Sequence, residues 1–146
     1  MLLTTCIHPE ILCALGKMGH HSRILIADGG YPVITATPAS AAKVWLNLMP
    51  GRVLATEVLE ALVATVPLEA AHVMTPTDGT DQPVFDEFQK RLPEGVTVEK
   101  VEKYDFYKKA LEPEVALVIA TGDTRNWANL LLTVGFVRHP EGMGKY

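Results

Sequence analysis

Residues 18–32 read Met18-Gly-His-His-Ser-Arg-Ile-Leu-Ile-Ala-Asp-Gly-Gly-Tyr-Pro32, and this stretch organises the rest of the chain. An apolar pattern at helical spacing stops at Gly19, and two histidines follow it. The aliphatic run Ile24–Ala27 predicts a buried strand, because it has a polar entry and ends at Asp28 before a Gly-Gly pair. Open α/β sheets bind ligands at the carboxyl ends of their strands, so Asp28 is a candidate binding residue.

Composition predicts one globular domain over residues 1–146, with a loose polar tail at 138–146. The chain is 48% hydrophobic and 21% charged, as is typical of soluble globular proteins. Its net charge of −4, without a basic cluster free of acidic neighbours, argues against a nucleic-acid partner. The apolar runs are too short to cross a bilayer, and the start lacks signal-peptide features, so we expect no membrane partner and a cytoplasmic location.

The chain has two cysteines, Cys6 and Cys13, whose spacing matches neither a metal motif nor a redox motif. We therefore expect both to be small buried hydrophobic residues in a reducing compartment.

Hydrophobic periodicity predicts alternating helices and strands. Helices are predicted at 8–18, 56–66, 84–92 and 105–111, strands at 23–28, 43–48, 71–74, 96–101 and 115–120, and a last apolar segment at 129–134. Thr56 is the expected N-cap of the second helix. This alternation favours an α/β fold, and the short apolar strands suit a single layered sheet flanked by helices on both faces.

His20 and Asp28 are the first candidates for chemistry. Because the unperturbed pKa of an imidazole lies near neutral pH, a histidine at position 20 could act as a general acid or base. The alternative is that His20 and His21 are surface residues at a helix terminus. Asp28 could hold a sugar hydroxyl or orient an imidazole, or it could form only an Asx-turn.

Aromatic and charged side chains elsewhere supply further candidates. Tyr107 belongs to an aromatic group beside Lys103, where rings could stack on a sugar and a phenol could exchange protons; simple packing is the alternative. Trp127 lies in a polar loop after a strong strand, either as a stacking platform or as a buried anchor. Glu69 follows Pro67 and reads from its position as a solvated loop acid.

Several chemistries have no motif in this chain. There is no Walker loop, dinucleotide fingerprint, Gly-x-Ser-x-Gly elbow or Cys-x-x-Cys pair. The Asp78–Asp81 loop has the wrong spacing for an EF-hand. The histidines form no recognised metal motif; they are His8, His20, His21, His72 and His139. We therefore expect no cofactor and no metal.

An ordered set of short motifs resembles the RbsD/FucU family of sugar mutarotases and pyranases. The likeness runs from about Pro9 to Val137 and is carried by Met18-Gly19-His20, Ile26-Ala27-Asp28, Pro32, Phe106-Tyr107-Lys108-Lys109-Ala110, Thr121-Gly122-Asp123 and Ala128-Asn129-Leu130. The resemblance implies cofactor-free interconversion of the forms of a free monosaccharide. It also implies a cytoplasmic homo-oligomer, commonly a ring-shaped decamer, with active sites between subunits.

Carried over residue by residue, the resemblance makes His20 a general acid and Tyr107 its possible catalytic partner. The sugar-binding residues that it implies are Asp28, Glu69, Lys103, Trp127 and Asn129. The main departure is Trp127, which stands where the family has tyrosine. A tryptophan can stack on a sugar and donate an N–H, but it cannot shuttle a proton.

We therefore expect a mutarotase that exchanges the α and β anomers of L-fucose, with His20 and Asp28 converging on one small carbohydrate. The Phe106-Tyr107 pair and the Tyr31-Pro32 turn favour the fucose branch. The alternatives are a ribose-type pyranase, a monosaccharide-binding accessory of a transport operon without catalysis, and a metal-dependent enzyme.

Overall fold

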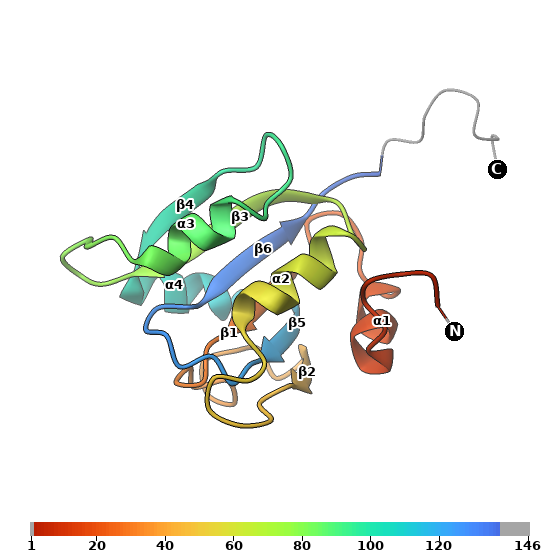
Figure 1. Cartoon of the computed structure of the whole chain (residues 1–146), viewed down its shortest axis with the longest axis horizontal. Coiled ribbons are helices and arrows are strands. Elements are labelled where there is room, and N and C mark those ends of the chain that lie inside the picture. Colours follow the sequence, from red (N-terminus) through yellow and green to blue (C-terminus); the bar gives the residue numbers. More distant parts are fainter. Residues whose placement is uncertain (1, 138–146) are drawn as a thin grey trace.

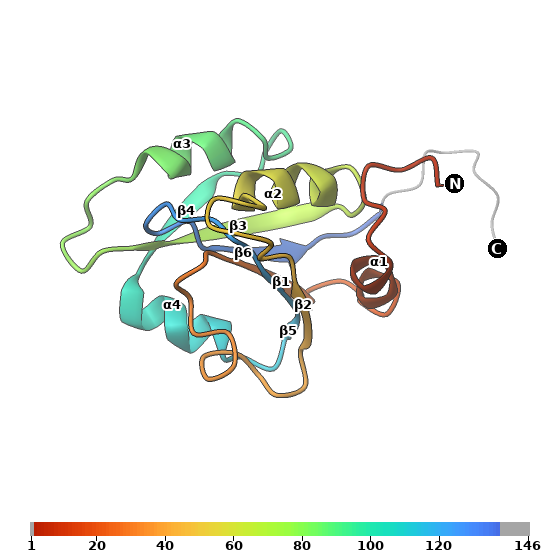
Figure 2. The same ribbon diagram turned by 60° about the horizontal axis from the view of Figure 1, so that its bottom comes forward.

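The computed structural model describes residues 2–137 and shows a six-stranded sheet with helices on both faces (Figures 1 and 2). Its elements are α1 (Pro9–Leu15), β1 (Arg23–Ala27), β2 (Ala42–Trp45), α2 (Ala55–Val63), β3 (Leu68–Thr75), α3 (Pro83–Gln89), β4 (Val98–Glu102), α4 (Lys103–Ala110), β5 (Val115–Ala120) and β6 (Leu130–Val134). The predicted α/β class is confirmed. The predicted loose tail, 138–146, lies outside the described residues.

The strands lie in the order β2-β5-β1-β6-β3-β4. β1 is parallel to β5 and β5 to β2, whereas β6 is antiparallel to both β1 and β3, and β4 is parallel to β3. Five strands therefore point the same way and β6 alone runs against them. The carboxyl ends of β1, β3, β4 and β5 meet at one edge of the sheet, which we call the carboxyl edge; the opposite edge is the amino edge.

β1 alternates its side chains between two cores, as strand geometry requires. Ile24 and Ile26 pack with residues of α1, α2 and α3 on one face. Leu25 and Ala27 pack with Phe106 of α4 and with the loop that follows β1 on the other face. Figure 2 shows α2 and α3 on one side of the sheet and α4 on the other. The expectation of a sheet covered on both faces is confirmed.

The predicted N-cap of α2 is wrong. Thr56 lies inside the helix and is buried, and the N-cap position is Leu54. The first helical N–H groups are satisfied from elsewhere, because Ala55 N donates to Asp123 Oδ2 at 2.9 Å. The carboxylate of Glu57 accepts from Leu54 N at 2.7 Å. The carboxylate of Asp123, 68 residues further along the chain than Ala55, thus takes the place of the predicted Thr56 hydroxyl cap.

Two other sequence expectations need correction. Cys6 is buried as expected, but Cys13 is exposed because it lies on the outer face of α1. Glu69 does not lie in a loop: β3 begins at Leu68, earlier than predicted, so Glu69 is its second residue.

Gly122 is needed where two backbone segments touch. A Cβ at this position would lie 1.8 Å from the carbonyl oxygen of Arg52, far inside contact distance. The approach is fixed by backbone hydrogen bonds from Gly51 N to Gly122 O at 2.7 Å and from Gly122 N to Val53 O at 3.1 Å. The loop after β5 is therefore held against the 49–53 turn.

Asp123 connects the same loop to two helices. Its side chain has no exposed surface, and it accepts hydrogen bonds from Arg125 Nε at 3.0 Å and from Arg125 NH2 at 2.7 Å. Arg125 also donates to Glu87 of α3 at 2.8 Å. Burial alone would raise the pKa of Asp123, but the bonds from Arg125 and from the first N–H of α2 outweigh it and lower the pKa.

We expect Gly122→Ala to destabilise the fold severely, by about 3 kcal/mol or more, because a methyl group cannot fit against the backbone of Arg52. Urea unfolding followed by circular dichroism measures the change. The matched control is Gly19→Ala, since a Cβ at Gly19 meets nothing within 4 Å. Equal stability of the two variants would contradict the close approach.

We expect Asp123→Asn to lower the free energy of unfolding by about 2–3 kcal/mol near neutral pH, because Arg125 loses a buried anionic partner. The pKa of Asp123 is lowered in the folded state, so its stabilisation is complete above the unfolded pKa of about 3.9 and fades as pH falls through the folded value. Unfolding at a series of pH values should show the difference from wild type narrowing in acid. Thr124→Ala, at an exposed neighbour, is the control; a pH-independent difference would contradict the assignment.

Candidate functional site

A cavity of about 360 Å³ opens at the carboxyl edge of the sheet. It is lined by Asp28, Gly30, Tyr31, Met74, Lys103, Tyr107, Asn126, Trp127 and Asn129. These residues come from the ends of β1 and β3, the start of α4 and the loop before β6. Of the predicted site residues, this cavity brings together Asp28, Lys103, Tyr107, Trp127 and Asn129; we call it the sugar-loop cavity.

Asp28 and Asn129 form a reciprocal pair on its floor. Asn129 Nδ2 donates to Asp28 Oδ2 at 2.8 Å, and Asp28 N donates to Asn129 Oδ1 at 2.8 Å. Asp28 Oδ1 also accepts from Gly30 N at 3.0 Å, which is the Asx-turn considered from the sequence. Each carboxylate oxygen keeps a further lone pair, so Asp28 can still accept hydroxyl donors. Burial raises the pKa of Asp28 above its ordinary value.

Aromatic rings make one side of the cavity. The centroids of Tyr31 and Tyr107 lie 5.5 Å apart. The hydroxyl of Tyr31 donates to Ala36 O at 3.1 Å. Burial raises the pKa of Tyr31 further above its ordinary value. The ring of Tyr31 is therefore a fixed part of the cavity wall. Trp127 has a φ of 67°, a left-handed conformation that costs energy in a non-glycine residue and occurs mainly where surrounding structure imposes it.

Sequence reasoning missed three cavity residues: Tyr31, Met74 and Asn126. Each carried a positional signal. Tyr31 follows the Gly-Gly pair after β1, Met74 lies at the carboxyl end of β3, and Asn126 immediately precedes Trp127 in the loop before β6. Only the strand order shows that these three positions adjoin one another.

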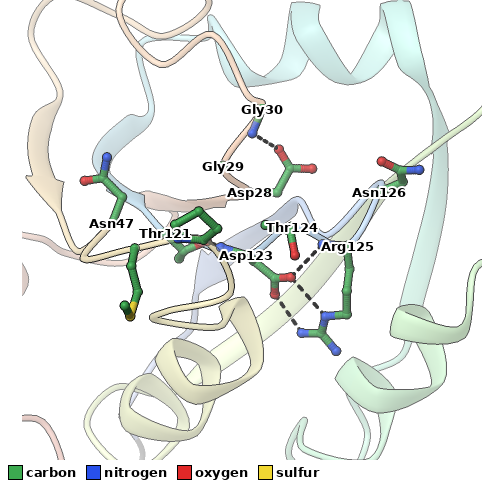
Figure 3. Close-up of a pocket in the computed structure, with 12 residues that line it drawn as sticks. Asp28, Gly29, Gly30, Asn47, Thr121, Asp123, Thr124, Arg125 and Asn126 are labelled. Atoms are coloured by element: carbon green, nitrogen blue, oxygen red, sulfur yellow. Dashed lines mark hydrogen bonds and ion pairs between the residues drawn. The ribbon is translucent and has the colours of Figure 1, made fainter.

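A second cavity of about 450 Å³ adjoins the first and shares Asp28, Gly30 and Asn126 with it. Figure 3 shows that Thr121 and Asp123 line it and that Arg125 turns back to Asp123 instead of pointing into the open space. The Asp123–Arg125 pair therefore shapes the loop and is already internally satisfied.

His20 and Glu69 lie together at the amino edge, away from the sugar-loop cavity. His20 Nε2 and Glu69 Oε2 are 2.9 Å apart, and the hydrogen bond to His20 lowers the pKa of Glu69. Within one chain His20 and Asp28 do not meet, so their convergence on one carbohydrate stays a prediction for a site between subunits. The two residues flank opposite ends of the five-residue strand β1, which spans about 16 Å at 3.3 Å per residue.

His20 faces a cavity of its own, of about 340 Å³, whose lining includes Met18, Val66 and Phe136. The ring of Phe136 meets His20 edge-on, with the centroids 5.9 Å apart. His21 Nδ1 lies 3.0 Å from Glu69 Oε1. The ligand atoms of His20, His21 and Glu69 all lie within 4.8 Å of one another, so these three residues could share a metal ion.

Exposed apolar side chains lie at both the carboxyl edge and the amino edge of the sheet. At the carboxyl edge, Leu48 is 80% exposed and Met49, which lines the second cavity, is 57% exposed. At the amino edge, Phe136 is 70% exposed beside His20. Across residues 2–137, none of the helices is long and apolar enough to cross a membrane.

Comparison with known proteins places this geometry in a family. A sequence model described as the RbsD / FucU transport protein family matches residues 1–137. The fucose mutarotase of Homo sapiens is 29% identical over 140 residues, covering 87% of this chain and 87% of the relative. The D-ribose pyranase of Staphylococcus haemolyticus is 29% identical over 137 residues, covering 94% and 99%.

A solved structure agrees with the sequence matches. The crystal structure of FucU from Bifidobacterium longum superimposes with a TM-score of 0.75 at 29% identity, covering 90% of this chain and 96% of that one. Sequence and fold thus lead to one conclusion: the chain belongs to the RbsD/FucU family.

Proposed function

We propose that this protein is a cofactor-independent mutarotase that exchanges the α and β anomers of L-fucose in the cytoplasm. The observation that carries the proposal is the sugar-loop cavity, where a carboxylate, an amide, a phenol and an indole surround a space open to a small polyol. The relatives are named both fucose mutarotase and D-ribose pyranase at equal identity, so the choice of sugar rests on the residues of the cavity.

We assign the two edges of the sheet to one active site shared between copies of the chain. His20 is too far from Asp28 within one subunit, and each group sits in a cavity flanked by exposed apolar side chains. Because the two edges differ, their contact is heterologous, and a heterologous contact forms a ring where its rotation closes. A ring-shaped homo-oligomer, a decamer in our proposal, would supply His20 and Glu69 from one copy and the sugar-loop cavity from the next.

Mutarotation requires two proton transfers. One group takes the proton of the anomeric hydroxyl while another gives a proton to the ring oxygen, so that the ring opens to an aldehyde. We propose that neutral His20 accepts the first proton and that the phenol of Tyr107 donates the second. On closure at the other face of the carbonyl the transfers reverse and both protons return.

The surrounding groups support these transfers. Glu69 orients the imidazole of His20 and stabilises its protonated form across their 2.9 Å contact. Asp28 and Asn129 hold each other and offer their free donor and acceptor positions to sugar hydroxyls. Trp127 gives an apolar wall for a C–H face, and Lys103, which lines the same cavity, binds a hydroxyl.

The test is exchange between anomer signals of L-fucose in saturation-transfer NMR. We expect His20→Ala to slow the exchange by about 10²-fold or more, since positioned proton transfer typically contributes this much. D-ribose and D-galactose are the comparison sugars. Undiminished exchange in the variant would remove His20 from the mechanism, and binding of L-fucose to wild type without exchange would support the binding-protein alternative.

Mixing inactive variants tests whether the site is shared. His20→Ala and Asp28→Asn should each be inactive alone. Unfolded together and refolded as mixed oligomers, they should regain about a quarter of wild-type activity, because one in four contacts then joins an intact His20 to an intact Asp28. No recovery, with oligomers of normal size, would contradict the shared site.

Trp127→Tyr tests the main departure from the family pattern. Restoring a phenol should raise or keep kcat, whereas Trp127→Ala should mainly raise KM for L-fucose, because it removes a wall without removing the proton-transfer pair. Exchange rates at several sugar concentrations separate the two parameters. A loss of kcat at unchanged KM in Trp127→Ala would show that the indole acts in the chemical step.

A further inference from the structure

His21 is part of the amino-edge cluster, but the proposed chemistry does not use it. Its ring stacks on that of His20 with the centroids 3.8 Å apart. Its Nδ1 and the Nε2 of His20 face the two different oxygens of Glu69, at 3.0 Å and 2.9 Å. Two imidazole nitrogens and a carboxylate therefore converge on one exposed point.

The backbone that presents these groups is fixed by the end of β6. His21 N donates to Val134 O at 3.0 Å, and Val134 N donates to Ser22 O at 2.8 Å. On the other side, Gly135 N donates to Pro67 O at 2.9 Å, next to the start of β3. The turn before β1 and the first residues of β3 are thus tied to the same strand end, which holds the three residues beside one another.

His21 also has an unusual backbone conformation. Its φ of 67° is left-handed, which is costly for a residue with a Cβ and is tolerated best by glycine and asparagine. This conformation turns the imidazole of His21 alongside that of His20 instead of to the opposite side of the chain. Conformations of this kind concentrate at ligand and active sites.

We propose that His20, His21 and Glu69 form a binding site for a divalent transition-metal ion of the zinc type. Two histidines and one carboxylate, with a fourth position open to solvent, form a common zinc ligand set. Tetrahedral ligation with bonds near 2.0–2.1 Å places ligand atoms about 3.3 Å apart. The ligand atoms of the three side chains lie within 4.8 Å of one another, so side-chain rotation can bring them to this spacing. No short sequence motif marks this ligand set, because Glu69 lies 49 residues after His20 in the chain.

The bound ion would inhibit mutarotation, a consequence that rests on the proposed function. A neutral imidazole that ligates a metal through Nε2 carries its remaining proton on Nδ1, so His20 could then accept a proton at neither nitrogen. The site would thus compete with the acid–base role of His20 and make the activity sensitive to free zinc. Binding itself does not depend on any sugar and can be measured separately.

The experiment titrates Zn²⁺ into the tag-free, metal-stripped oligomer by calorimetry and follows Co²⁺ by its visible absorption. We expect one ion per chain, and binding weaker by about tenfold or more in His21→Asn and in Glu69→Gln. Asparagine is chosen because it tolerates the left-handed backbone at this position. His72→Gln is the matched control, since the partly buried His72 forms another histidine–carboxylate contact, with Glu99 at 3.2 Å, and the variant should bind like wild type.

Anomer exchange of L-fucose with and without Zn²⁺ completes the test. We expect Zn²⁺ to slow wild type at the concentration where it binds and to leave His21→Asn, which keeps its basal exchange, largely unaffected. Absence of binding, equal binding in His21→Asn, or loss of binding only in His72→Gln would overturn the metal site. Zinc that binds at the cluster without slowing anomer exchange would overturn the proposed inhibition. If the wild-type protein exchanged the anomers of no sugar, the proposed function would be overturned while the metal site would stand.

Discussion

The extended geometry of β1 is the constraint on which the rest of the structure depends. Its residues Ile24–Ala27 are fully buried at the centre of the sheet, paired with β5 on one side and β6 on the other. A strand so enclosed cannot bend, so the groups at its two ends stay apart. His20 therefore belongs to the amino edge and Asp28 to the carboxyl edge, and chemistry that needs both requires a second copy of the chain.

The carboxyl edge owes its shape to contacts between loops. Parallel strands bring the residues after β1, β4 and β5 to the same side, and β6 begins where those strands end. The loop that carries Trp127 and Asn129 is tied to α2 and α3 through Asp123 and Arg125 and to the 49–53 turn through Gly122. The buried carboxylate of Asp123, paired with the partly exposed Arg125, thus fixes a cavity wall whose own side chains stay available for a ligand.

The amino edge follows a different principle, because its functional groups are exposed and paired with one another. Glu69 contacts two stacked histidines without burial, which suits the proposed encounter with a ligand bound to a neighbouring subunit. The same arrangement gives a transition-metal ion three ligands. Proton transfer and metal binding would then compete for the imidazole of His20.

By itself the sequence determined the α/β class, most strands and helices, and five residues of the sugar-loop cavity. The class and the elements follow from local patterns of aliphatic runs, Gly-led loops and polar residues after strands. The cavity residues follow from such patterns together with the family resemblance, and Asn129 from the resemblance alone. The tertiary structure alone decided that Glu69 lies in β3 beside His20 and that Asp123 caps α2 from the far end of the chain. It also decided that His20 and Asp28 do not meet within one subunit. The physical reason is that strand order brings residues far apart in the chain into contact, whereas the side-chain pattern along one strand does not specify which strand it pairs with.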